Sequence, residues 1–456
     1  MTHSKKIISL LLVMVVTLSL SLGFNRQDLL AEAEEPWEIA LKNKYFNYDV
    51  TDAATEASSH LQGICVDDEM KYAYLSYTDT LLKLDLASGE VVGSVCDFGP
   101  GSITAEGGAH IGCLAYYNGK VYGSLEYKSP GKKFFLVVFD PSKITEIGMS
   151  FQDMEEGVDA VLLAEPTADF RDPLNDEPSS DDGTAVNNDP LGHRFGCSGI
   201  DGVTFARLPG DDSDKIYCLV AYGIFANGEE WQQRYDNNYN IIQVYDPEMF
   251  DEHYDPETGE GDSVLRRFVY ERGIDMSFEE NEALNAVDTY YVWTGTTTWG
   301  CQNLEAERDS RDIVLYTYST PKKGWEKWSQ ADAAFVIDGE AGYELKELEV
   351  GQSNKNSDQE IREAALSKAD CYKVDGIFPE VKHLSLKCIC GEDCQAQEWA
   401  DTGYNTMVCG AVIDGSTATF GIVSLGNDYY FMAHDKYQMS LFQRDENFNF
   451  TLVGEK

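Results

Sequence analysis

Residues 110–123 read HIGCLAYYNGKVYG, and this stretch decides the fold class. His110 opens a short run of apolar and aromatic residues, and Asn118-Gly119 follows it. Asn-Gly between two such runs is a strong signal for a β-hairpin with a two-residue turn. The same order of a polar opening, a short strand and a turn returns along the chain. It indicates small antiparallel sheets repeated in sequence.

The repeat occurs in five recognisable units. We place them at residues 58–98, 110–154 and 196–271, from residue 290 onward, and from residue 419 toward the end. Repeated sheets of this size stack radially in a β-propeller. We therefore predict an all-β, five-bladed β-propeller with two loop insertions, and a six-bladed propeller as the alternative if residues 335–350 form another blade. Residues 37–50 are expected to add the closing strand to the last sheet.

The first residues are typical of an export signal. Lys5 and Lys6 precede an apolar run at residues 7–22, and residues 31–33 give an Ala-x-Ala cleavage site. The run is close to the ~20 residues that span a bilayer, so an uncleaved N-terminal anchor is the alternative. We expect residues 1–33 to be a signal peptide and the protein to be secreted, extracellular or on the cell surface. It would meet a membrane only if the leader is retained.

Residues 34–456 are predicted to form a single propeller domain with two insertions. The first, near residues 165–192, is acidic and lacks a period, which is typical of a loop. The second, near residues 351–405, carries a cluster of cysteines at positions Cys371, Cys388, Cys390 and Cys394. Long loops of this kind commonly border a binding site.

Acidic residues dominate the charge. The chain has 79 Asp and Glu against 35 Lys and Arg, a formal net charge of -44. Such a surface repels phosphates and anionic lipid, which excludes nucleic acid as a partner. It favours divalent cations, which bind oxygen ligands, although acidic residues also promote solubility without any ligand. We expect a monomer.

The chain contains 11 cysteines. Export permits disulfides, and an odd count leaves at least one thiol unpaired in a monomer. Cys65, Cys113 and Cys218 lie inside apolar strands and are expected to be buried thiols. We predict a disulfide staple in the cluster at 371–394, with a zinc site as the alternative.

A propeller brings the first residues of its innermost strands together around one channel. His60, His110, Asp201 and Gln302 hold such positions, and we predict that they bind a divalent metal, Ca or Mn. His60, His110 and Asp201 are also the candidate catalytic residues, because a metal activates water and a neutral imidazole accepts a proton near pH 7. The predicted ligand-binding residues are His193, Ser198, Asn303, Asp414 and Ser416. The alternative is that these side chains only hydrogen-bond the backbone or water.

Several catalytic arrangements are missing from the sequence. It has neither a Gly-x-Ser-x-Gly elbow nor a glycine-rich phosphate loop. A glycosidase needs paired carboxylates, whereas histidines open the first two units. Glu305 follows Gln302 along the chain and is either a general acid or a solvent-facing side chain.

Four motifs carry a resemblance. The stretches HLQGIC from residue 60, HIGCLAYYNGKVYG from residue 110, CSGIDGVTF from residue 197 and GCQNLE from residue 300 resemble a group of bacterial secreted β-propeller proteins without an assigned activity. More distantly, the set His60, His110 and Gln302 is similar to the metal site of propeller oligogalacturonate lyases. That likeness implies these three residues as ligands. The calcium site of lactonase propellers, built from Glu, Asn and Asp, does not match.

These observations favour two functions. The first is a metal-assisted hydrolase or lyase that acts outside the cell on a small or glycan-like substrate. The second is a non-catalytic propeller that binds a small molecule, a carbohydrate or another protein.

Overall fold

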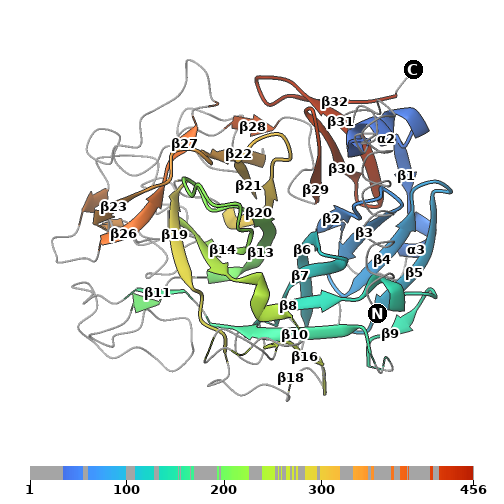
Figure 1. Ribbon diagram of the computed structural model, residues 1–456, viewed down its shortest axis with the longest axis horizontal. Coiled ribbons are helices and arrows are strands. Elements are labelled where there is room, and N and C mark those ends of the chain that lie inside the picture. Colours follow the sequence, from blue (N-terminus) through green and yellow to red (C-terminus); the bar gives the residue numbers. More distant parts are fainter. Residues whose placement is uncertain are drawn as a thin grey trace, which may run out of the picture.

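The structure is a computed structural model. It describes residues 34–54, 60–98, 108–127, 133–152, 154, 156–164, 166–168, 193–194, 197–224, 239–251, 255, 258, 263–267, 270–271, 274–275, 283–294, 298–318, 332–347, 351–353, 371–373, 380–387, 389, 411–413 and 421–454. These residues form a five-bladed β-propeller, as predicted (Figure 1). Each blade is a mostly antiparallel sheet whose first strand lies nearest the axis.

Blades one and two each follow the hairpin pattern read from the sequence. Blade one contains β2 (Gly63–Val66), β3 (Tyr72–Tyr77), β4 (Thr80–Asp85), β5 (Glu90–Cys96) and an edge strand, β9 (Met149–Ser150). Blade two contains β6 (Ala109–Tyr117), β7 (Lys120–Tyr127), β8 (Lys133–Phe139), β10 (Val158–Leu163) and β16 (Arg266–Arg267). The turn between β6 and β7 is formed by Asn118 and Gly119, which have φ angles of 47° and 78°. Asn and Gly tolerate this left-handed region better than other residues do.

Blades three and four are wider and meet at their outer edges. Blade three contains β13 (Cys197–Ala206), β14 (Tyr217–Ile224), β15 (Tyr239–Tyr245), β19 (Asp288–Trp293), β26 (Glu380–Leu384) and β23 (Tyr343–Glu347). Blade four contains β20 (Thr298–Ala306), β21 (Ile313–Tyr318), β22 (Asp332–Ile337), β27 (Leu386–Lys387) and β28 (Ala411–Ile413). The segment 380–387 thus joins both sheets.

Blade five closes the ring with strands from both ends of the described chain. It contains β29 (Ile422–Gly426), β30 (Tyr429–Asp435), β31 (Gln438–Arg444), β32 (Phe450–Leu452) and β1 (Asn47–Asp49). β1 follows α2 (Pro36–Asn43), precedes α3 (Thr51–Ala54) and pairs with β31, with Tyr48 opposite Met439. Figure 1 shows β1 in blue beside the red strands. The expected closing strand is confirmed.

The hydrophobic core is divided among the blades. Five clusters of buried residues each join two neighbouring blades, and one of them packs blade five against blade one. Leu75 and Phe431 belong to that last cluster and are both fully buried. The innermost strands also contact one another in order around the ring, from β2 through β6, β13 and β20 to β29 and back to β2. Closure removes the sheet edges that an open array would expose.

Two sequence expectations about the blades are wrong. The described residues 335–347 do not form the sixth blade that was the alternative, because β22 belongs to blade four and β23 extends the outer edge of blade three. The strand at residues 288–293 does not begin blade four. It is β19, the fourth strand of blade three, and a long segment separates it from β15. The order of strands along the chain therefore predicted the wrong blade for a strand that follows a long connection.

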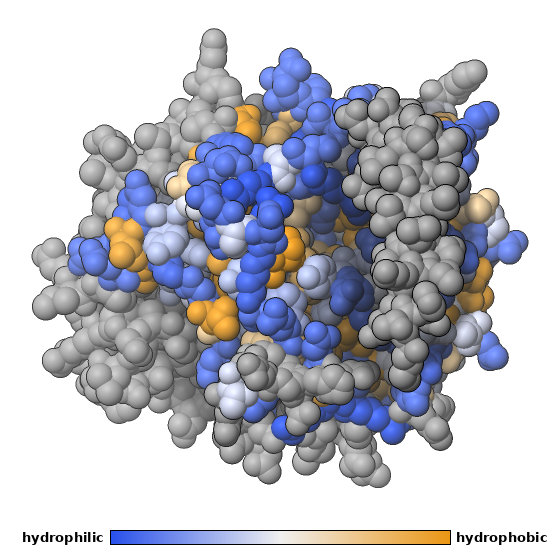
Figure 2. All heavy atoms as spheres, viewed as in Figure 1, coloured by the Kyte–Doolittle hydropathy of each residue, from blue (hydrophilic) through white to orange (hydrophobic). Residues whose placement is uncertain are grey.

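The leader and most of both insertions lie outside the described residues. Within the insertions the described strands include β11 (Thr167–Ala168), β24 (Gly351–Ser353) and β25 (Cys371–Lys373). In the part of the chain that is described, no helix has the length and apolar character needed to cross a membrane. Figure 2 shows a mainly hydrophilic described surface on the viewed face, with scattered hydrophobic residues.

No disulfide joins any two of the cysteines whose side chains are described. These are Cys65, Cys96, Cys113, Cys218 and Cys301. Cys65, Cys113 and Cys218 are buried, as predicted. The side chains of the 371–394 cluster lie outside the described residues, so the predicted staple stays a prediction.

Candidate metal centre

Three neighbouring innermost strands carry a β-bulge at the same level. In β13 the extra residue is Asp201, between Ile200 and Gly202, and in β20 it is Gln302. β6 has its irregularity between Ile111 and Leu114. A bulge breaks the alternation of side chains and re-aims the extra residue. It therefore turns Asp201 and Gln302 toward a shared space near the axis, where Gln302 Nε2 donates to Asp201 Oδ2 at 3.3 Å.

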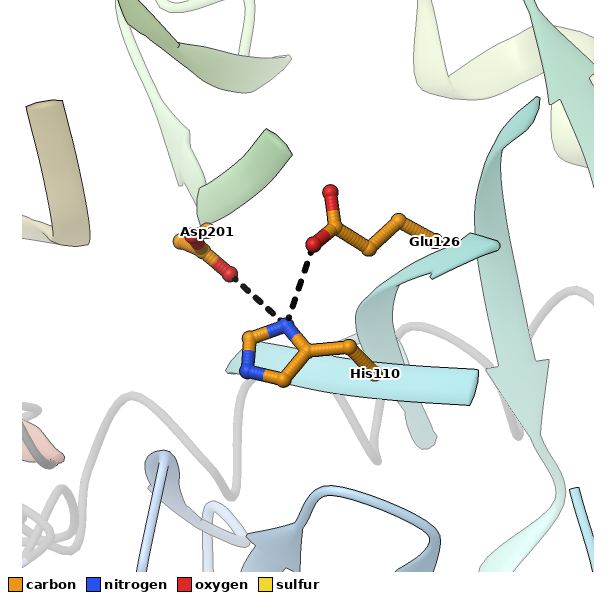
Figure 3. A group of neighbouring side chains, drawn as sticks. All are labelled: His110, Glu126 and Asp201. Carbon is orange, nitrogen blue, oxygen red and sulfur yellow. Dashed lines mark ion pairs between the residues drawn. The ribbon is translucent and has the colours of Figure 1, made fainter. Parts of the chain in front are cut away.

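His110, Glu126 and Asp201 form the centre of this space (Figure 3). His110 Nδ1 lies 3.2 Å from Asp201 Oδ1 and 3.5 Å from Glu126 Oε1. One potential ligand atom from each residue lies within 4.8 Å of the other two. An imidazole nitrogen with two carboxylate oxygens is a donor set suited to a divalent metal.

Glu126 reaches the centre through the register of one hairpin. β6 pairs with β7, and His110 lies directly opposite Glu126. The two residues therefore project from the same face of blade two. Glu126 is fully buried, and the side chains of Asp201 and His110 are 9% and 13% exposed.

Glycines keep the space open for the carboxylates. A Cβ on Gly199 would lie 2.7 Å from Glu126 Cδ and 2.8 Å from Oε1. A Cβ on Gly112 would lie 2.7 Å from Asp201 Oδ1 and 2.6 Å from Ser124 Oγ. Real Cβ atoms do not approach other atoms so closely, so any side chain at either position would displace a carboxylate or a strand.

Acidic side chains outnumber basic ones in the group of His110, Glu126 and Asp201. Two carboxylates face one imidazole, and Nδ1 carries at most one proton to share between them. Burying two carboxylates removes their hydration, which costs free energy. A bound cation would offset that cost.

His60 lies next to this group at the opening of blade one. It is partly buried, and its Nδ1 is 3.2 Å from the carbonyl oxygen of Leu61. Burial lowers the pKa of His60 below its usual value, and the neighbouring His110 lowers it further. The imidazole is therefore mainly neutral near pH 7, the form that accepts a proton.

The other predicted site residues have different places. Asn303 is completely buried, and its Nδ2 donates to the carbonyl oxygen of Gln62 at 3.3 Å, linking β20 to the segment before β2. Ser198 lies in β13 and His193 in β12 (His193–Arg194), but their side chains are outside the described part. Asp414 and Ser416 lie wholly outside it.

Glu126 is not among the site residues predicted from the sequence. An unbroken ladder from the Asn118-Gly119 turn pairs Tyr117 with Lys120 and would place Tyr127 opposite His110. The bulge in β6 shifts the register by one residue and brings Glu126 there instead. The available signal was a charged residue inside the otherwise apolar and aromatic run VYGSLEY at residues 121–127.

The fold and the site together define a β-propeller with a polar axial centre that can hold a metal ion. No protein-family model and no curated protein matches the chain. Among solved structures, the chain is similar to the one described as "Structure of U3-55K", with 9% sequence identity and a TM-score of 0.28 over 87% of this chain and 81% of that one. Because these values are low, the fold is assigned from the five sheets and their closed ring and not from this similarity. The likeness to secreted propellers and to propeller lyases stays a prediction.

Proposed function

We propose that the protein binds a divalent metal ion at the axial centre through His110, Glu126 and Asp201, with Gln302 beside them. One observation carries the proposal: two buried carboxylates converge on a single imidazole. Oxygen ligands suit Ca and Mn, and the imidazole nitrogen favours Mn over Ca. The net charge of -44 attracts cations to the protein.

We further propose that the metal serves a hydrolase or lyase acting on a small or glycan-like substrate. A divalent metal polarises a carbonyl or phosphoryl oxygen, or lowers the pKa of a bound water. His60 would accept the proton that the reaction releases, since burial favours its neutral form. The apolar leader supports secretion, and the acidic surface supports a partner other than nucleic acid.

The second candidate is a non-catalytic propeller with a structural ion. The low exposure of Glu126 and Asp201 favours it, because a substrate must reach a catalytic metal. A thermal-shift screen of sugars, lactones and phosphoesters, followed by turnover assays of any stabilising compound, separates the two. Stabilisation without turnover would favour the binding protein.

The metal is tested directly by elemental analysis and by thermal shift with Mn²⁺ and Ca²⁺. At a metal concentration 100 times Kd, the folded state should gain about 2.7 kcal/mol. His110→Ala and Glu126→Gln should each abolish most of that gain, because each removes one donor. Protein purified without chelator should contain close to one metal ion per chain.

His383→Ala is the matched control. It removes an imidazole from β26 at the outer edge of blade three, where the ring packs 5.2 Å from Tyr239. This variant should keep the full response to metal even if its stability falls. Absence of bound metal, together with no shift from either ion in the unsubstituted protein, would refute the proposal.

A further inference from the structure

A cavity of about 260 Å³ lies among the innermost strands, away from the metal centre. All five innermost strands contribute to its lining, with Val66, Leu114, Phe205, Glu305 and Val423. Glu305 lies three residues after Gln302 on β20, which corresponds to roughly 10 Å along a strand. The cavity is therefore displaced along the axis from the metal centre.

Glu305 is the buried acid of this cavity. It is 9% exposed, and its Oε1 accepts a hydrogen bond from the backbone N–H of Ser424 at 2.7 Å. Arg308 Nε donates to the carbonyl oxygen of Ser424 at 2.9 Å and so helps to fix that segment of blade five. Among the described residues, no hydrogen-bond donor reaches the second oxygen, Oε2. The second oxygen of this carboxyl group is therefore available to hydrogen-bond a ligand in the cavity.

Few of the described titratable groups lie close enough to Glu305 to interact with its charge. The titratable groups that act on it or feel its charge are Glu307, Arg308, Cys65, Cys113 and Tyr316. Burial raises the pKa of Cys113 to about 12 and keeps Cys65 and Tyr316 protonated as well. Glu307 forms an ion pair with Arg444, whose Nη1 lies 2.8 Å from Glu307 Oε1.

The other residues of the cavity wall indicate which charge the ligand carries. Asp68 and Glu307 add two more carboxyl groups, and Arg308 is exposed at the rim. Leu114, Phe205 and Val423 supply apolar surface for a short hydrocarbon. The strongly negative protein as a whole concentrates cations at such a mouth and repels anions.

We propose that this cavity binds a small organic ammonium ion, whose nitrogen donates to Glu305 and whose hydrocarbon part contacts the apolar wall. The ligand is a primary amine, either free or as the side chain of a lysine in a partner. Glu305 is not a metal ligand in this proposal, and it lies apart from the candidate metal centre.

Binding of an ammonium ion should release the proton of the Glu305 carboxyl group, and this release can be measured. Burial raises the pKa of Glu305 to about 8, so the carboxyl is mostly protonated at pH 7. An ammonium ion pairs with the carboxylate, and binding must then expel the carboxyl proton. At pH 9.5 the group is already ionised, and binding should release none.

The experiment titrates butylammonium chloride into the full chain by calorimetry at pH 7, in two buffers of different ionisation enthalpy. We expect saturable binding with release of about one proton. Butyrate, which has the same carbon chain and the opposite charge, should not bind. Glu305→Gln should weaken butylammonium binding by about tenfold or more, because it removes the charge and keeps the size. Nα-acetyl-lysine amide tests whether the ligand is a lysine side chain. If it binds with an affinity comparable to that of butylammonium, the ligand is the lysine of a partner. If butylammonium binds and Nα-acetyl-lysine amide does not, the ligand is a free amine.

Glu69→Gln is the matched control, since it makes the same change at an exposed position on the same turn as Asp68. It should bind butylammonium as the unsubstituted protein does. Glu305→Gln should keep its response to Mn²⁺, which separates this cavity from the metal centre. Equal binding by Glu305→Gln, butyrate binding in place of butylammonium, or no binding of butylammonium by calorimetry and thermal shift would each overturn the proposal.

Discussion

Glu305 shows how burial sets the chemistry of a single residue. The strand that places Gln302 near the axis also places Glu305 in the interior, against the expectation that it could face solvent. Desolvation is the main reason that its pKa rises to about 8, and Glu307 adds to the effect. The hydrogen bond from Ser424 and the charge of Arg308 oppose it and are too weak to restore the usual value.

The pH dependence of stability follows from that pKa. The folded state holds the Glu305 proton up to about pH 8, whereas the unfolded chain loses it near the ordinary value of 4.5. The contribution to stability is therefore fully present below pH 4.5 and is lost as the pH rises to about 8. Between pH 6 and pH 9 the loss is about 3 kcal/mol, because the pH rises by two units before it reaches the pKa of about 8.

Chemical denaturation at pH 6 and pH 9 measures this loss. Glu305→Gln should show a smaller decrease between the two pH values than the unsubstituted protein, because the amide does not ionise. Glu69→Gln should show the full decrease. Identical pH profiles for all three proteins would contradict the assignment of the proton to Glu305.

At the scale of elements, the bulged strands build the metal centre. β6, β13 and β20 each break their ladder at the level of the site. Regular strands would alternate their side chains between the two faces of each blade, where neighbouring blades pack. The irregularities let Asp201 and Gln302 leave that pattern, and Gly199 lets β13 approach Glu126.

Gly199→Ala should therefore damage the metal centre more than the fold. The added methyl group would overlap the carboxyl group of Glu126. We expect a loss of stability of about 1–3 kcal/mol and a weaker response to Mn²⁺ in thermal shift. Gly123→Ala in the same blade is the control, since its nearest contact is a flexible side-chain carbon of Leu114 at 3.1 Å. An unchanged metal response in Gly199→Ala would argue against Glu126 as a ligand.

At the scale of the whole molecule, closure of the ring depends on a short strand from the beginning of the described chain. Tyr48 in β1 is 6% exposed, its hydroxyl donates to Leu86 O at 2.8 Å, and its ring packs edge-on against Phe431. One side chain thus joins blade one to blade five.

Tyr48→Ala should destabilise the protein by about 3–5 kcal/mol, because it empties a buried aromatic site between two blades. Urea denaturation monitored by tryptophan fluorescence measures the change. Asn47→Ala, at an exposed position of the same strand, should change stability by less than about 0.5 kcal/mol. A similar small effect for both variants would show that β1 contributes little to closure.

The sequence by itself determined the propeller, the closing strand at residues 37–50 and the group of His110, Asp201 and Gln302. These depend on local patterns: alternation, the Asn118-Gly119 turn and polar residues where strands begin. Only the tertiary structure decided that Glu126 completes the centre, that Glu305 is buried and that β19 and β23 belong to blade three. The bulges lie in strands that contact one another around the axis, and an outer strand pairs across a long connection. Both depend on contacts between residues far apart in the chain, which a local pattern does not encode.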